Sequence, residues 1–230
     1  MNQAPTDTLQ HQTPALRMLV TLGGVAMLSG FLIVLVYQLT KPIIEENQRL
    51  AIEQMVFKLV PAASIRRDIE LAPGLSVYAA YDEQGRLKGV VAQGAAQGYA
   101  DLVHLLYNYA PDCDCIKGFD ILKMAETPGL GDKILTDKAF LANFDYLDAR
   151  LNAAGDGLAN PIVTVKHGKK QEQWQIDAIS GATVTSRAVG KAINDSAQQM
   201  LPLLQPRLEG IRQIELEQTP AEQTQAEQQP

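Results

Sequence analysis

The chain has 230 residues, a formal net charge of −6 and a hydrophobic content of 46%, which suits one anchored domain or at most two small ones. The acidic balance argues against binding of nucleic-acid phosphates, and an aromatic content of 6% argues against a base-stacking surface. Two cysteines exclude a disulfide-dense scaffold and a four-cysteine zinc site, and their spacing from the histidines fits no zinc finger. We therefore expect no nucleic-acid partner and no metal site.

An uncharged, apolar stretch from Met18 to Thr40 is flanked by a basic residue on each side. A helix of this length spans about 34 Å, enough for the hydrocarbon core of a bilayer. We predict a disordered start over residues 1–14 and a transmembrane anchor over 15–40. A cleaved signal peptide and a buried core helix are the alternatives, and no A-x-A cleavage site follows the stretch. More basic residues follow the span than precede it, which leans against a cytoplasmic N-terminus but leaves the orientation open.

The part of the chain after the anchor begins with apolar residues at helical spacing over residues 41–60. We predict a helix that leaves the membrane, with Pro42 in its first turn. A β-hairpin is predicted next, with strands Leu75–Tyr81 and Leu87–Ala92 on either side of a turn that contains glycine. Ile116–Met124 is a further predicted strand.

The C-terminal half alternates helical and β-prone patterns. Phenylalanine and leucine recur at steps of three and four in residues 134–154, which predicts a helix. Residues 161–166 and 172–176 are predicted to form a second hairpin. Arg187–Leu201 is predicted to be a final amphipathic helix that Pro202 ends.

These elements give an α+β fold: a single N-terminal transmembrane helix followed by one domain of antiparallel hairpins with flanking helices, over residues 41–212. Residues 213–230 are rich in Gln, Glu, Pro and Thr, and we predict that they are disordered. No internal repeat is visible in the sequence.

The most specific pattern is Asp177-Ala-Ile-Ser-Gly-Ala-Thr183-Val-Thr-Ser186, at a predicted strand–turn–helix junction. Its three hydroxyl residues, Thr183, Thr185 and Ser186, are good candidates for helix N-caps. A helix N-terminus also binds anions, because it combines free N–H groups with the positive end of the helix dipole. From spacing alone, a capped junction without chemistry is the preferred interpretation, and an anion site is the alternative.

The letters D-A-I-S-G-A-T resemble the flavinylation motif of the FMN-binding domain family. The resemblance implies that the hydroxyl of Thr183 is esterified to the phosphate of FMN by a dedicated FMN transferase acting with Mg²⁺. It also implies that Ser180, Gly181 and Ala182 belong to the FMN site, and that Asp177 is recognised by the transferase. On sequence, Thr185 and Ser186 remain rivals of Thr183, since any of the three hydroxyls could accept a phosphoryl group.

A second stretch, Glu126-Thr-Pro-Gly-Leu-Gly131, is similar to a loop of the same family. Pro-Gly marks a turn, and a final glycine lets the backbone come close to a planar ligand. The resemblance implies that Thr127, Leu130 and Gly131 lie against the flavin or its ribityl chain. Taken alone, the stretch also fits an ordinary exposed turn.

Within this family, the chain most resembles the G subunit of the Rnf ion-translocating electron transport complex, and it is related to the C subunit of the sodium-translocating NADH:quinone reductase. The resemblance implies an electron-carrier subunit with covalent FMN that does not catalyse the overall reaction alone and has no catalytic residue of its own. Its partners would be the other membrane subunits of the complex. Its domain would lie on the periplasmic side of the cell inner membrane. The alternatives are a non-redox periplasmic flavin sensor and a structural assembly subunit.

Cys113 and Cys115 lie outside both motifs, and only one residue separates them. This spacing is unfavourable for a disulfide, so we expect a loosely packed loop, with a metal or iron–sulfur site shared with a neighbour as the alternative.

Overall fold

A computed structural model describes residues 15–213. Its contacts divide the chain into two units, with the boundary between Leu50 and Ala51, and each unit is described by itself. The predicted disordered stretches 1–14 and 213–230 lie outside the described residues, apart from Gln213.

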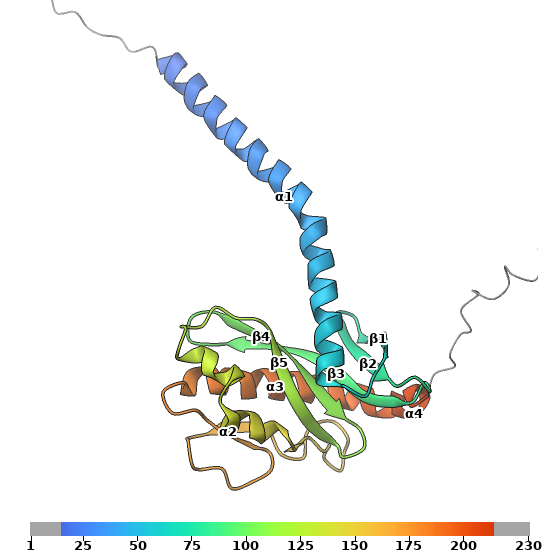
Figure 1. Cartoon of the computed structure of the whole chain (residues 1–230). Helices are drawn as coiled ribbons and strands as arrows, with labels where there is room; N and C mark the ends of the chain where they lie inside the picture. Colours follow the sequence, from blue (N-terminus) through green and yellow to red (C-terminus); the bar gives the residue numbers. More distant parts are fainter. Residues whose placement is uncertain (1–14, 214–230) are drawn as a thin grey trace, which may run out of the picture. The chain divides into compact units, whose positions relative to one another are not determined.

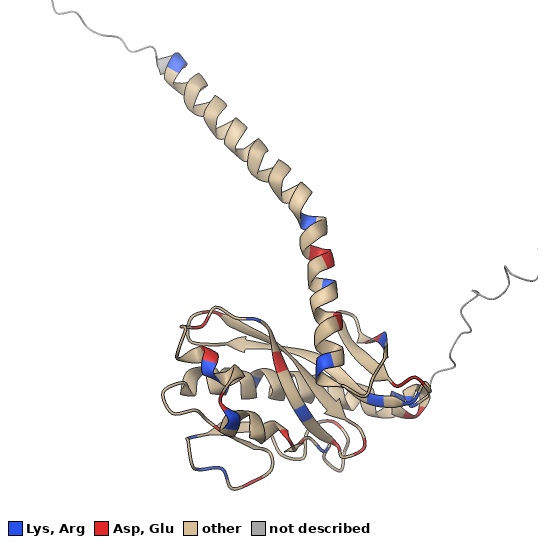
Figure 2. Ribbon diagram, in the orientation of Figure 1, with Lys and Arg blue, Asp and Glu red and all other residues tan. Residues whose placement is uncertain are grey.

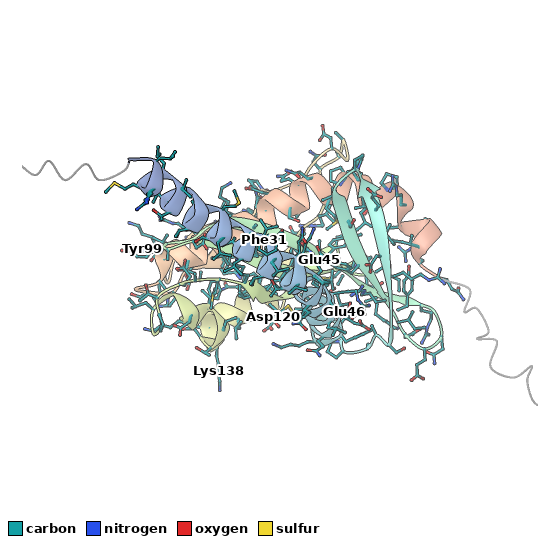
Figure 3. All side chains as sticks on the ribbon, turned by 90° about the horizontal axis from the view of Figure 1, so that it is seen from above. Phe31, Glu45, Glu46, Tyr99, Asp120 and Lys138 are labelled. Carbon is teal, nitrogen blue, oxygen red and sulfur yellow. A yellow bond between two sulfur atoms is a disulfide. The ribbon has the colours of Figure 1, made fainter. Side chains whose placement is uncertain are left out.

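The first unit is the N-terminal part of helix α1, which runs without interruption from Ala15 to Leu59. Its apolar side chains are exposed along the whole unit, Phe31 for example to 62% (Figure 3). Figure 2 shows no charged residue in the apolar stretch from Met18 to Thr40. Within the described residues, α1 is the one helix long and apolar enough to span a bilayer. Pro42 lies inside this continuous helix, so its predicted place in a first turn is wrong.

The second unit contains an antiparallel sheet with strand order β1-β2-β3-β4-β5-β6. The strands are β1 (Ile65–Ala72), β2 (Leu75–Tyr81), β3 (Leu87–Gln97), β4 (Leu102–Ala110), β5 (Cys115–Lys123) and β6 (Leu147–Asp148). The predicted α+β fold of antiparallel hairpins with flanking helices is confirmed. The sequence predictions omitted β1 and β4, and they placed the end of β3 too early.

The β2–β3 turn is fixed by Asp82, whose carboxylate Oδ1 accepts hydrogen bonds from the backbone N–H groups of Gln84 and Arg86, at 3.0 and 2.9 Å. The Arg86 and Lys88 side chains form ion pairs with Oδ2. Burial raises the pKa of the Asp82 carboxyl group, but the hydrogen bonds from Arg86 and Lys88 outweigh it and hold the pKa at about 2.

Two layers cover the sheet. Helix α3 (Thr183–Leu204) crosses one face (Figure 1) and buries Val189, Ile193 and Met200 against apolar side chains of the strands. On the other face, Val56 from the last turns of α1 packs with Tyr78 and Leu106. Side chains alternate between the faces along each strand, so both layers share one sheet.

Helix α3 comes unusually close to the sheet. An added Cβ at Gly94 of β3 would lie 2.5 Å from the carbonyl oxygen of Ala192, and one at Gly190 of α3 would strike Oγ1 of Thr164, which lies outside this sheet. The position of α3 therefore depends on these two glycines. The helix starts four residues earlier and ends three residues later than predicted, and Pro202 lies inside it.

The helix predicted over 134–154 is wrong. This stretch forms only short pieces, η1 (Gly131–Leu135), α2 (Lys138–Leu141) and η2 (Ala142–Phe144), followed by β6. Phe140 and Phe144 lie at helical spacing in the adjoining pieces α2 and η2, and their rings pack on each other and on Phe119 of β5, with centroids 4.6–6.0 Å apart. The periodicity reflects tertiary packing rather than one long helix.

The second predicted hairpin is also wrong. Strands β7 (Val163–Val165) and β8 (Gln175–Asp177) occur close to the predicted places, but they pair in parallel. The intervening loop contains two turns, closed by hydrogen bonds from Lys169 N to Lys166 O and from Gln175 N to Glu172 O. These turns bring the chain back beside the start of β7, so β8 runs in the same direction as β7.

Cys113 and Cys115 form a disulfide, which corrects the prediction of a loosely packed loop with unpaired cysteines. Asp114 between them adopts a positive φ of 48°, and its carboxylate accepts a hydrogen bond from the hydroxyl of Tyr109 at 2.7 Å. This local turn between β4 and β5 brings the two Cα atoms to 5.1 Å, within the range that a disulfide requires. The remaining elements are η3 (Gln205–Arg207) and α4 (Leu208–Ile211).

Candidate functional site

The motif around Thr183 forms the junction between β8 and α3. Gly181 turns the chain with a φ of +84°, a conformation that favours glycine. Ala182 occupies the N-cap position, and Thr183 is the first residue of the helix. The first helical hydrogen bond runs from Ser186 N to Ala182 O at 2.9 Å, so the preceding N–H groups of the first turn have no partner within the helix. This end of α3 therefore has the donors and the dipole that favour an anion.

The expected N-cap role of the three hydroxyl residues is wrong, because all three lie inside the helix and no side chain caps it. The side chain of Ser186, which is fully buried, donates to Ala182 O at 2.9 Å and accepts from Ile179 N at 3.1 Å. From the first turn of α3, Ser186 thereby stabilises the chain turn at Ile179–Ala182 that precedes the helix.

Burial separates the three hydroxyls. Thr185 is only 2% exposed, and its Oγ1 donates to Glu126 Oε2 at 2.5 Å. Ser186 is 0% exposed and engaged as described. Thr183 is half-buried, and its Oγ1 makes only a long hydrogen bond of 3.4 Å to Ile179 O. Thr183 is therefore the hydroxyl that a reagent from solution reaches most easily.

The loop Glu126–Gly131 makes a tight turn. Leu130 N and Gly131 N both donate to Thr127 O, at 3.2 and 3.1 Å. Pro128 and Gly129 are the central residues of this turn, and Gly129 has a φ of +78°. Proline followed by a glycine with positive φ is the pattern of a type II turn. The turn directs Leu130 outward, where its side chain is 50% exposed.

Both motifs line one cavity of about 550 Å³. Among the predicted site residues, those that line it are Thr127, Leu130, Gly131, Gly181, Ala182 and Thr183. The folded chain thus brings together two stretches about 50 residues apart in sequence. Tyr99, Glu126, Val184 and Thr185 complete the lining.

Asp177 and Ser180 do not line this cavity. They face a second, smaller cavity of about 280 Å³, together with residues of the Lys133–Phe140 segment and His167. The Asp177 carboxylate accepts a hydrogen bond from Gly168 N at 3.0 Å and lies 3.6 Å from His167 Nδ1. The motif loop therefore separates two cavities, with the predicted recognition acid on the other side from Thr183.

Asn143 fixes the backbone at the start of the motif. It is 4% exposed, its Oδ1 accepts from Asp177 N at 3.0 Å, and its Nδ2 donates to Asp177 O at 3.3 Å. Lys170 Nζ also donates to Asn143 Oδ1, at 3.1 Å. Burial lowers the pKa of Lys170, while the charge of Asp177 opposes this effect.

Several residues around the site were missed from sequence. Tyr99 lines the first cavity with a side chain that is 74% exposed (Figure 3). An exposed tyrosine next to a glycine carried no signal that separated it from an ordinary turn residue. Asn143 was hidden inside the wrongly predicted helix. Glu126 was part of the quoted loop, but its buried position could not be read from spacing. Within residues 15–213, no group of three or more His, Cys, Asp and Glu side chains is placed to hold a metal ion.

Comparison with known proteins gives two family matches. Residues 98–198 match the FMN-binding domain, and residues 14–57 match the RnfG N-terminal region. The cavity residues described above all lie within the first match. The second match covers most of α1.

Two relatives are similar to this chain over most of their length. The chain is 30% identical to the G subunit of the ion-translocating oxidoreductase complex of Pseudomonas aeruginosa over 193 residues, which cover 78% of this chain and 85% of the relative. It is 27% identical to the protein of the same name in Methanosarcina acetivorans, over 78% of this chain and 91% of the relative. The crystal structure of Shewanella oneidensis NqrC is 26% identical, with a TM-score of 0.47 over 63% of this chain and 69% of that chain. The chain belongs to the RnfG family, the G subunits of ion-translocating oxidoreductase complexes, and its domain is an FMN-binding domain.

Proposed function

We propose that this chain is a membrane-anchored electron carrier of an ion-translocating oxidoreductase complex, with FMN joined to the hydroxyl of Thr183 by a phosphoester. The observation that carries the proposal is the place of Thr183. It is the half-buried hydroxyl at the start of α3, on a cavity that both motifs line. The two rival hydroxyls are buried and engaged in short hydrogen bonds.

The cavity fits FMN in size and chemistry. A volume of about 550 Å³ lies within the range that is typical of small-molecule and cofactor sites. An added Cβ at Gly181, which lines the cavity, would meet nothing within 4 Å, so the backbone there borders open space. The N-terminus of α3 offers N–H donors to a phosphate group, and Leu130 and Val184 offer apolar surface to a ring system.

Bound FMN supplies the capacity to accept and release electrons one or two at a time. The residues of this chain hold it in place. A phosphoester at Thr183 removes dissociation as a route of loss, and the first turn of α3 stabilises the remaining phosphate charge. We propose that Thr127, Leu130 and Gly131 contact the flavin or its ribityl chain, and that Gly181 and Ala182 shape the turn beside the phosphate.

Attachment requires an FMN transferase, acting with Mg²⁺, as a transient partner that transfers the FMN group of FAD to the Thr183 hydroxyl and releases AMP. We propose that Asp177 and Ser180 form its recognition surface. Both residues line the second cavity, so an enzyme can contact them while Thr183, on the first cavity, stays open to receive the FMN group.

The membrane part of the proposal places the anchor at residues 15–40, the FMN-binding domain at 41–212, and the domain on the periplasmic side of the cell inner membrane. The length and composition of α1 support an anchor. The other membrane subunits of the complex are then the electron donor and acceptor partners. A reporter that is active only in the periplasm, fused after residue 212, is expected to be active. An inactive reporter whose fusion is intact would refute this orientation.

The decisive experiment measures the covalent flavin. The full chain is produced together with the transferase, denatured on a gel and illuminated. We expect flavin fluorescence and a gain in intact mass equal to one FMN less one water. Fragment masses should place the gain on Thr183 rather than on Thr185 or Ser186.

Two variants of Thr183 provide a matched pair. Thr183→Val keeps the shape of the side chain but removes the hydroxyl, so it should abolish the added mass. Thr183→Ser keeps a hydroxyl and should retain it. A fluorescent Thr183→Val protein would refute the attachment site, and an unmodified parent chain produced with active transferase would refute the covalent carrier.

The relay itself is tested in membranes that contain the assembled complex. Rapid-mixing spectra should show this flavin being reduced and reoxidised at least as fast as the complex turns over. A flavin whose redox state stays fixed during turnover would favour a sensing or assembly role.

A further inference from the structure

The carboxyl group of Glu126 joins three segments that line the cavity. Its Oε1 accepts hydrogen bonds from the backbone N–H groups of Tyr99 and Ala100, at 2.9 and 3.2 Å. Its Oε2 accepts a hydrogen bond from Thr185 Oγ1 at 2.5 Å. One side chain, 8% exposed, thereby connects the turn after β3, the loop after β5 and the first turn of α3.

Two glycines leave room for this carboxyl group. An added Cβ at Gly98 would strike Glu126 Oε1. One at Gly131 would lie 2.6 Å from Glu126 Cβ, 2.7 Å from Oε2 and 3.0 Å from Thr185 Oγ1. Side chains at either position would have to displace the glutamate. The backbone on two sides is therefore shaped around a carboxyl group at position 126.

The hydrogen bonds indicate the charge of the group. All three donate to Glu126, and an ionised carboxylate is a pure acceptor that such donors satisfy. Among the residues that line the cavity, Glu126 alone has an acidic or basic side chain. The wall of the cavity thus carries one fixed negative charge, which is only weakly screened because the group is buried.

We propose that Glu126 is a positioning residue of the FMN cavity: it holds the three segments in register, and its charge lowers the reduction potential of the flavin. The electrostatic part rests on the proposed function. Each electron added to the flavin adds negative charge, and a nearby carboxylate makes that addition less favourable. The positioning part concerns the protein alone.

The electrostatic part is tested by potentiometric titration of the full chain produced with the transferase. Glu126→Gln keeps an oxygen for the two backbone donors and removes the charge, so the midpoint potential of the flavin should shift to a more positive value. The matched control is Asp101→Asn, which removes the same charge from an exposed side chain of the same turn and should shift the potential much less. An unchanged potential in Glu126→Gln, or equal shifts in both variants, would overturn the electrostatic part.

The positioning part is tested without flavin, by hydrogen exchange in the full chain produced without transferase. In Glu126→Ala the amides of Tyr99 and Ala100 lose a charged acceptor and should exchange about tenfold faster or more. Glu126→Gln should keep most of the protection. Unchanged exchange in Glu126→Ala would overturn the positioning role. A parent chain without covalent flavin would count against the Thr183 proposal instead, and hydrogen exchange would still decide the role of Glu126.

Discussion

Substitution of Gly94 by alanine tests whether α3 is set by its close approach to the sheet. The new Cβ would lie 2.5 Å from the carbonyl oxygen of Ala192 and 2.9 Å from its carbonyl carbon. Ordinary contacts of a Cβ begin near 3.4 Å. Because the obstacle is helix backbone, it cannot rotate away as a side chain would. The helix and β3 must therefore separate by several tenths of an ångström up to about 1 Å.

The size of the effect follows from two opposing contributions. Inserting a methyl group into a packed interface costs about 1–3 kcal/mol. Replacing glycine in a strand returns about 0.5–1 kcal/mol, because alanine has less freedom to lose on folding. The net loss is about 1 kcal/mol, with an upper end near 2.5 kcal/mol. With a urea dependence of about 2 kcal/mol per molar, the midpoint of unfolding should fall by about 0.5 M, and by about 1.2 M at most.

Trp174 makes the measurement simple, since it is the single tryptophan of the chain and lies in the second unit. Urea unfolding of the full chain in detergent is followed by its fluorescence. Gly210→Ala is the control, because an added Cβ there meets nothing within 4 Å and the midpoint should not fall. Because Thr183 begins α3, Gly94→Ala should also reduce the covalent FMN per chain. A midpoint equal to that of the parent would refute the argument that this contact sets the helix.

Three further outcomes are expected. Because the pKa of Asp82 is lowered to about 2, its carboxylate stabilises the fold above about pH 4, and this contribution is lost as the pH falls toward 2. The urea midpoint of the Asp82→Asn variant should therefore change less between pH 4 and pH 2 than the midpoint of the parent chain. Gly181→Ala forces an L-residue into a positive φ and should destabilise the domain by about 1 kcal/mol in the same urea assay, whereas Gly181→Asn should cost less; equal losses would argue against backbone strain. Alkylation should label Cys113 and Cys115 only after the disulfide has been reduced, and labelling without reduction would show free thiols. Reduction should lower the stability of the domain by less than about 2 kcal/mol, because the disulfide closes a very short loop.

The first hairpin was predictable because its signals are local. Strand Leu75–Tyr81 was predicted at its exact bounds, and the turn after it contains Asp82 and Gly85, whose preferences act within a few residues. The fold class was also predictable from the pattern of hairpins and helices, and six residues of the cavity lining were predictable from the two sequence motifs.

The wrong predictions concern segments whose structure depends on tertiary packing. The spacing of Phe140 and Phe144 fits a helix, yet their partner is Phe119 in a strand about 20 residues earlier. Strands β7 and β8 were located, but the direction of pairing depends on two turns between them whose geometry the sequence pattern does not specify. A period in the sequence indicates which side chains share a face, and it does not identify the element they pack against.

The choice among Thr183, Thr185 and Ser186 shows what spacing alone cannot decide. All three hydroxyls lie within one helical turn, so their local chemistry is nearly the same. They differ because Glu126, about 60 residues earlier in the chain, accepts a hydrogen bond from Thr185, while Ser186 forms hydrogen bonds with the turn before the helix. Selectivity for one hydroxyl would then come from the removal of its competitors by burial and hydrogen bonding, rather than from any special reactivity of Thr183. On this argument, a fully unfolded chain should offer these three hydroxyls equally to a small phosphorylating reagent, whereas in the folded chain Thr183 should be the one of the three that reacts.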